Sequence, residues 1–129
     1  MRVRILAAGL LLSCASSLTQ VASGPDFTLE PGQTVQLAGT GVRVTFLEVA
    51  NDSRCPVDVV CVTAGDAEVR VAVVGEGEDR TVSLHTMQEP RSVTIGAVRL
   101  ELTGLTPAPR STVTIRPQDY RATIRWSAP

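Results

Sequence analysis

Residues 51–66 hold most of the side chains in this chain that could do chemistry. Cys55 and Cys61 lie there with five residues between them, one of which is Pro56. In an oxidising compartment, two cysteines across such a bend predict a structural disulfide, which closes a loop of seven residues. The charged side chains of this segment are candidates for a partner-binding surface, and they belong to Asp52, Arg54, Asp58 and Asp66.

The cysteines also belong to a set of soft ligands that could bind Cu(I). The set is Cys55, Cys61, His85 and Met87, and the last two would share one face of a strand. A disulfide would remove two of these four ligands, and the Cys-x5-Cys spacing is not typical of copper sites. His85 and Met87 then remain as the candidate ligands.

The aspartates of the same segment suggest a second alternative, a calcium site. Asp52, Asp58 and Asp66 carry the oxygen ligands that Ca²⁺ prefers, but their spacing matches no EF-hand loop. Loop aspartates usually cap turns through the backbone instead. We therefore expect no resident metal and no cofactor.

No pattern in the chain indicates an enzyme. The only histidine is His85, which falls in an alternating strand pattern typical of a half-exposed residue. No nucleophile elbow, phosphate-binding loop or His-Glu-x-x-His pattern is present. We expect a non-catalytic protein.

The N-terminus reads as a signal segment over residues 1–23. Two arginines precede an uncharged apolar run over residues 5–12, which is too short to span a bilayer. Leu11-Leu12-Ser13-Cys14 resembles a lipobox and predicts cleavage before Cys14, which would carry the lipid anchor. Ordinary cleavage near Ser23 is the alternative. The chain has three cysteines, so pairing of the other two leaves Cys14 over, which favours lipidation.

The cysteine segment resembles part of a family of uncharacterised bacterial exported proteins, many of them lipoproteins. The matching residues are Asp52-Ser53-Arg54-Cys55-Pro56, Cys61 and Ala64-Gly65, with looser similarity at Leu105-Thr106-Pro107-Ala108-Pro109 and Asp119-Tyr120. The family typically has a Trp two residues after the second cysteine, where this chain has Thr63. The resemblance implies export and a disulfide, and it implies no activity.

From Phe27 onward, the apolar residues recur at every second position and turn residues separate the runs. This pattern predicts eight or nine short strands in one all-β domain over residues 24–129. We expect a small antiparallel two-sheet sandwich, immunoglobulin-like in the loose sense. The alternating runs cover residues 42–47, 68–74, 82–84, 98–103, 112–115 and 120–126.

Charge and composition limit the classes of partner that we expect. The formal net charge is −1 with acidic and basic residues interspersed, so no basic patch for nucleic acid is expected. The leading hypothesis is an exported, envelope-associated binding module of unknown ligand, anchored through Cys14 or free in the periplasm or medium. The alternatives are a secreted protease inhibitor using the Cys55–Cys61 loop and a periplasmic metal-handling protein.

Overall fold

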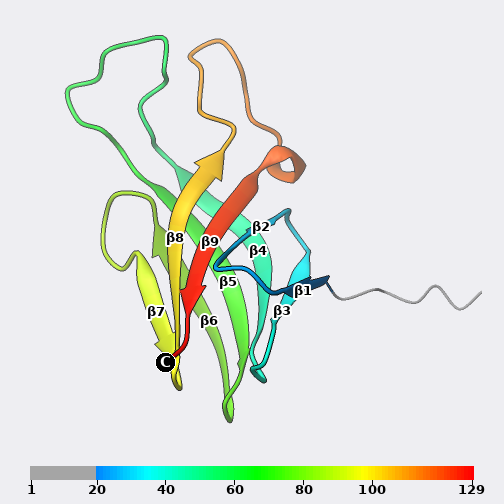
Figure 1. Cartoon of the computed structure of the whole chain (residues 1–129). Helices are drawn as coiled ribbons and strands as arrows, with labels where there is room; N and C mark the ends of the chain where they lie inside the picture. Colours follow the sequence, from blue (N-terminus) through cyan, green and yellow to red (C-terminus); the bar gives the residue numbers. More distant parts are fainter. Residues whose placement is uncertain (1–19) are drawn as a thin grey trace, which may run out of the picture.

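Two β-sheets form the part of the chain that the computed structural model describes, residues 20–129 (Figure 1). The five-stranded sheet has the order β1-β3-β4-β5-β6, and the four-stranded sheet has the order β2-β9-β8-β7. The elements are β1 (Gln20–Ala22), β2 (Asp26–Leu29), β3 (Thr34–Leu37), β4 (Arg43–Asp52), β5 (Ala67–Gly75), β6 (Glu78–His85), β7 (Ser92–Ile95), β8 (Val98–Thr106), the 3-10 helix η1 (Pro117–Asp119) and β9 (Arg121–Ser127). The predicted all-β, two-sheet architecture is confirmed. Cys14, the predicted lipidation site, lies outside the described residues.

The alternating pattern sorts side chains between the core and the surface as expected. In β4, Val44 and Phe46 are fully buried, whereas Arg43 and Leu47 on either side of this pair are exposed. β-branched residues favour such half-buried strands because they pack well on a pleated surface. The same alternation in both sheets builds one core, whose largest fully buried members are Phe46, Leu29, Leu37, Leu84, Ile95, Leu100, Leu102 and Ile124.

The strand pairings are antiparallel except for one. β1 pairs in parallel with β3, with Gln20 opposite Val35 and Ala22 opposite Leu37. This strand falls inside the predicted signal segment, and it was not expected from the alternating pattern. Ala22 is buried, so the sheet uses β1 as a packed edge strand.

One predicted strand is wrong. Residues 112–115 lie in the connection between β8 and β9, where a single bridge joins Arg110 to Val113. Prolines 107, 109 and 117 flank this short run, and proline cannot donate to a sheet hydrogen bond. Three strands of four residues, β2, β3 and β7, lie outside the predicted runs, because so short a run carries little periodicity.

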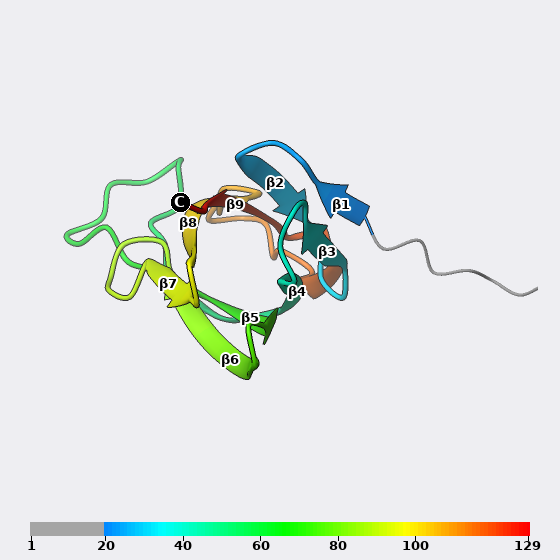
Figure 2. The ribbon, with the colours of Figure 1, turned by 60° about the horizontal axis from the view of Figure 1, so that its bottom comes forward.

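Two long connections lie together at one end of the molecule. Residues 53–66 join β4 to β5, and residues 107–120 join β8 to β9 (Figure 1). We call them the cysteine loop and the proline loop. A third connection, the histidine loop (residues 86–91), joins β6 to β7. Seen from below, the strands surround the core, and β6 and β7 lie next to one another although they belong to different sheets (Figure 2).

Candidate functional site

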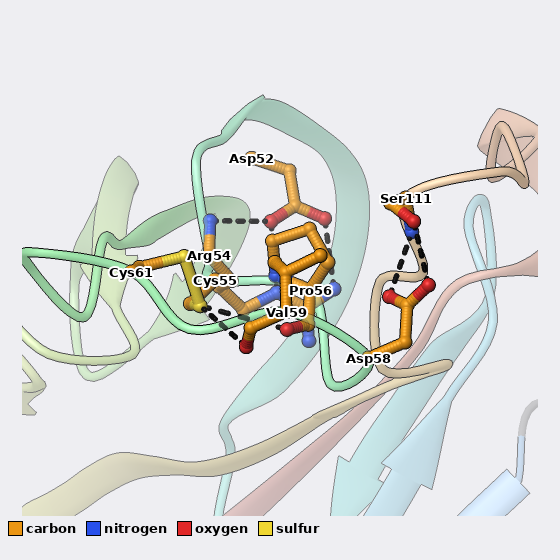
Figure 3. The surroundings of a disulfide bond; sticks show 8 residues. All are labelled: Asp52, Arg54, Cys55, Pro56, Asp58, Val59, Cys61 and Ser111. Carbon is orange, nitrogen blue, oxygen red and sulfur yellow. Dashed lines mark hydrogen bonds and ion pairs between the residues drawn. A yellow bond between two sulfur atoms is a disulfide. The ribbon is translucent and has the colours of Figure 1, made fainter.

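The cysteine loop is closed near its middle by the predicted disulfide. Cys55 and Cys61 are bonded, and their Cα atoms are 5.9 Å apart (Figure 3). The bond closes a ring of seven residues and limits the conformations open to the segment between the cysteines. The segment between the cysteines is therefore conformationally restricted.

An ion pair fixes the start of the cysteine loop. Arg54 donates from Nε and Nη2 to the two oxygens of Asp52, both at 2.8 Å, and both side chains are largely buried. Arg54 also donates to the carbonyl oxygens of Leu105 and Pro107, at 2.8 and 3.0 Å. This one guanidinium ties the cysteine loop to the start of the proline loop.

Tyr120 completes this network from the far end of the proline loop. Its hydroxyl donates to Asp52 Oδ2 at 2.9 Å. Burial opposes ionisation of Asp52, but the hydrogen bonds from Arg54 and Tyr120 outweigh it and hold the pKa of Asp52 below its ordinary value. Burial and the neighbouring carboxylate raise the pKa of Tyr120 to about 12.

A second buried carboxylate fixes the end of the cysteine loop. Asp66 Oδ2 lies 2.6 Å from Nδ1 of His85, and Asp66 Oδ1 accepts hydrogen bonds from the backbone N–H groups of Met87 and Gln88. Burial opposes ionisation of Asp66, yet these donors hold its pKa below the ordinary value. The side chain of Asp66 thereby joins the cysteine loop to the histidine loop.

A third contact supports the loop near its tip. Asp58 accepts hydrogen bonds from the backbone N–H and the hydroxyl of Ser111 in the proline loop (Figure 3). These bonds lower the pKa of Asp58. Nearby, Val57 N–H donates to the carbonyl of Pro109 at 2.9 Å. The cysteine loop and the proline loop thus support one another along their length.

Four valines are exposed on the cysteine loop, among the exposed residues Ser53, Asp58, Cys61, Thr63 and Ala64. The exposed fractions are 58% for Val57, 45% for Val59, 100% for Val60 and 104% for Val62. Val113 of the proline loop is also exposed, at 59%. We call the four exposed valines of the cysteine loop the valine tip. Their exposure was not predicted from the sequence, although an apolar run inside a disulfide-closed segment that is not a strand was a usable signal.

The predicted site residues are therefore distributed among separate contacts. Asp52, Asp58 and Asp66 each have their own partners and do not converge, and in residues 20–129 no group of three or more His, Cys, Asp or Glu residues could hold a metal ion. Nδ1 of His85 faces Asp66, and Met87 is exposed in the histidine loop. Both cysteine sulfurs are in the disulfide.

Comparison with known proteins adds no relative to this description. No family model, no curated protein and no solved structure matches the chain. Within residues 20–129, none of the helical structure is long and apolar enough to cross a membrane.

Proposed function

We propose that this protein is an exported, non-catalytic binding module that docks onto a partner protein through the valine tip. One observation carries the proposal: Val60 and Val62 are fully exposed on a loop that a disulfide and three sets of side-chain contacts hold in place. Single exposed valines are ordinary on protein surfaces. A cluster of them on a protruding loop is typical of an interaction site.

The energetics of docking favour a loop built in this way. Burying one valine side chain is worth about 1.5–3 kcal/mol, so two of them contribute a factor of about 10² to 10⁴ in affinity. A flexible loop would lose part of this gain in ordering its backbone on binding. The disulfide and the contacts of Asp52, Asp58 and Asp66 order the loop in the free protein.

The chemistry of the tip favours a protein partner over a lipid surface. Segments that insert into the membrane interface are rich in Trp, Phe or Leu and carry exposed Lys or Arg. The cysteine loop has none of the first three residue types and no lysine, and its one cation, Arg54, is turned inward. β-branched aliphatic side chains on a narrow, protruding loop suit a concave apolar pocket.

The disulfide fits an oxidising, extracytoplasmic location. For the mode of export we propose lipidation at Cys14, which the packing of β1 supports. Cleavage near Ser23 would remove β1, whose Ala22 is buried and whose Ala22 carbonyl accepts a hydrogen bond from Ala38 N–H. Cleavage before Cys14 would retain this strand and leave a short tether between the lipid and the domain.

A second candidate function is inhibition of a protease. The observation in its favour is that Val59 and Val60 lie exposed inside the ring closed by Cys55–Cys61, as in a preorganised insert for an active-site cleft. It predicts inhibition of a protease that prefers small aliphatic residues, with loss of inhibition when the disulfide is reduced. An unreduced protein that inhibits none of a panel of such proteases would remove this candidate.

The proposed docking is tested by comparing baits that differ only at the tip. The immobilised domain is incubated with an envelope fraction of the source cells, and retained proteins are quantified by mass spectrometry. Val60→Thr with Val62→Thr keeps the side-chain shape but places two hydroxyls in the apolar contact, so binding of the specific partner should fall about a hundredfold. Val74→Thr, on a partly exposed valine at the end of β5, is the matched control. Equal retention by all three baits would contradict the proposal.

A further inference from the structure

A groove lies between the outer edges of β6 and β7, at the open side of the two sheets. Its volume is about 360 Å³, and its apolar wall is formed by Val82, Leu84, Pro90 and Val93. Consecutive residues of each strand line it, and consecutive strand residues point to opposite faces of a sheet. The groove therefore runs along the two strand edges and does not lie over one face.

The backbone of β6 presents hydrogen-bonding groups to this groove. Thr86 N–H donates inward to Ala67 of β5, whereas His85 N–H donates outward to the carbonyl of Pro90. In an antiparallel strand, the direction of the backbone groups alternates from residue to residue. Thr81 and Ser83, which have the same parity as His85, therefore direct their N–H and C=O groups toward the groove.

The edge of β7 faces the groove in the same way. The carbonyl of Arg91 accepts from Leu102 of β8, so Ser92 and Thr94 direct their backbone groups away from β8. Consistent with this direction, the carbonyl of Thr94 is reached by the Arg80 side chain from across the groove. In residues 20–129, β6 and β7 each end a sheet, and no strand pairs with their outer edges.

Arg80 gives the groove a charge preference. Its Nη1 atom contacts Thr94 O at 3.4 Å and Glu78 Oε2 at 3.5 Å, and its side chain is about half exposed. Both contacts are longer than the 2.7–2.9 Å typical of a charge-assisted hydrogen bond. The guanidinium can therefore donate shorter hydrogen bonds to a carboxylate of a ligand.

We propose that the outer edge of β6 binds an extended peptide segment of a partner protein by strand addition. The backbone of the peptide pairs with Thr81 and Ser83, an aliphatic side chain enters the groove beside Val82 and Val93, and an acidic side chain binds Arg80. The edge from residue 80 to residue 84 is about 14 Å long at about 3.4 Å per residue, which fits about five peptide residues. This site is separate from the valine tip and does not depend on it.

Two substitutions at one position isolate the backbone donor. Ser83→Pro removes the outward N–H while leaving the pairing with β5, because proline is tolerated where a strand's N–H faces outward. Ser83→Ala keeps that N–H, and both variants lose the same hydroxyl contact with Glu68. Any difference between them therefore reports the backbone hydrogen bond at the free edge.

The probe is a peptide obtained by selection from a random dodecapeptide display library on the wild-type domain. We expect peptides with alternating aliphatic residues and an acidic residue, amide shifts in NMR spectra at Thr81, Ser83 and Ser92, and binding to Ser83→Ala within about twofold of wild type. Binding to Ser83→Pro should fall about tenfold, and Arg80→Gln should weaken the acidic peptides by a similar factor.

Three results would overturn the proposal. One is a selection that yields no binding peptide. Another is a set of peptides that bind Ser83→Pro and Ser83→Ala equally. The third is a wild-type domain that sedimentation shows to be a dimer and that Ser83→Pro converts to a monomer, because the edge would then pair with a second copy of the chain.

Discussion

Tyr120 and Asp52 share a hydrogen bond at the base of the cysteine loop, and this bond couples the phenol to a buried carboxylate. The folded protein raises the pKa of Tyr120 to about 12, above the ordinary value of 10.0. The protonated phenol therefore stabilises the fold below about pH 10, and this contribution is lost as the pH rises through about 12.

Absorbance titration can follow this group directly because Tyr120 is the only tyrosine in the chain. We expect the tyrosinate absorbance of the folded protein to rise with a midpoint near pH 12. In Asp52→Asn the negative charge is removed, so the midpoint should move toward the ordinary value. A wild-type midpoint near the ordinary value would show that the bond between Tyr120 and Asp52 is absent in solution.

The lowered pKa of Asp66 predicts that the stability of the fold depends on pH in the acidic range. Its pKa in the folded protein lies below the ordinary value of 3.8, so its ionised form stabilises the fold above about pH 4, and this contribution is lost as the pH falls through the folded pKa. We expect Asp66→Asn to lower the free energy of unfolding by about 1–2 kcal/mol at about pH 7, because a charge-assisted hydrogen bond is lost. Urea unfolding should show a smaller difference between the two proteins at about pH 3. A constant difference across this range would contradict the assigned role.

The disulfide of the cysteine segment could be predicted from the sequence, but the distant partners of its charged residues could not. The disulfide was predicted from the spacing of two cysteines and is present. Asp52 and Arg54 were predicted as members of a partner-binding loop, which stays a prediction, and the structure shows that they bond to Tyr120 and Leu105. Those partners lie 68 and 51 residues away along the chain, and only the folded topology brings them to the loop.

Gly65 is the position at which the cysteine loop most clearly requires one residue type. Its φ is +69°, and a Cβ there would lie 1.8 Å from the carbonyl oxygen of Ser53. The loop closes on itself at this point, and the backbone pairing between Ser53 and Asp66 leaves no room for a side chain. The Ala-Gly step seen in the sequence thus has a steric cause.

We expect Gly65→Ala to destabilise the domain by about 3 kcal/mol or more, because it combines a left-handed backbone with a clash against backbone atoms. Gly77→Ala is the matched control: its φ is +75°, but no atom lies within 4 Å of the added Cβ. That variant should cost only about 1–2 kcal/mol. Thermal or urea unfolding of both variants measures the difference, and equal losses would mean that the loop base can open without cost.

At the level of strands, the alternating pattern succeeded where a run was long and failed where it was short. The runs in β4, β5, β8 and β9 placed their apolar residues in the core as expected. Residues 112–115 had the same alternation, but the flanking prolines and the lack of a neighbouring strand leave them in a loop. β1 was missed because its three residues fall beside the apolar leader.

The start of β1, near the proposed lipid anchor, and the valine tip lie on opposite sides of the molecule. Figures 1 and 2 show the start of β1 on one side of the domain and the cysteine loop on the opposite side. A lipid on Cys14 would lie six residues before Gln20, a span of at most about 20 Å. The domain would then lie close to a membrane, and the valine tip would lie on the side of the domain opposite the anchored strand.

Intact mass spectrometry of the protein purified from its own cells tests this arrangement. We expect a mature chain that begins at Cys14, carries a lipid and lacks two hydrogen atoms because of the disulfide. Replacement Cys14→Ala should abolish the lipid mass and release the protein from the membrane fraction. A mature chain that begins at Gly24 would contradict both the anchor and the retention of β1.

The central claim is that the valine tip contacts a partner protein, and site-specific photo-cross-linking in intact cells tests it most directly. A photoreactive amino acid is placed at Val60 in one strain and at Val74, at the far end of β5, in another. We predict one discrete protein adduct from position 60, none from position 74, and loss of the adduct when Cys55 and Cys61 are both replaced by Ser. Adducts to lipid alone from position 60, or the same adducts from both positions, would contradict the claim.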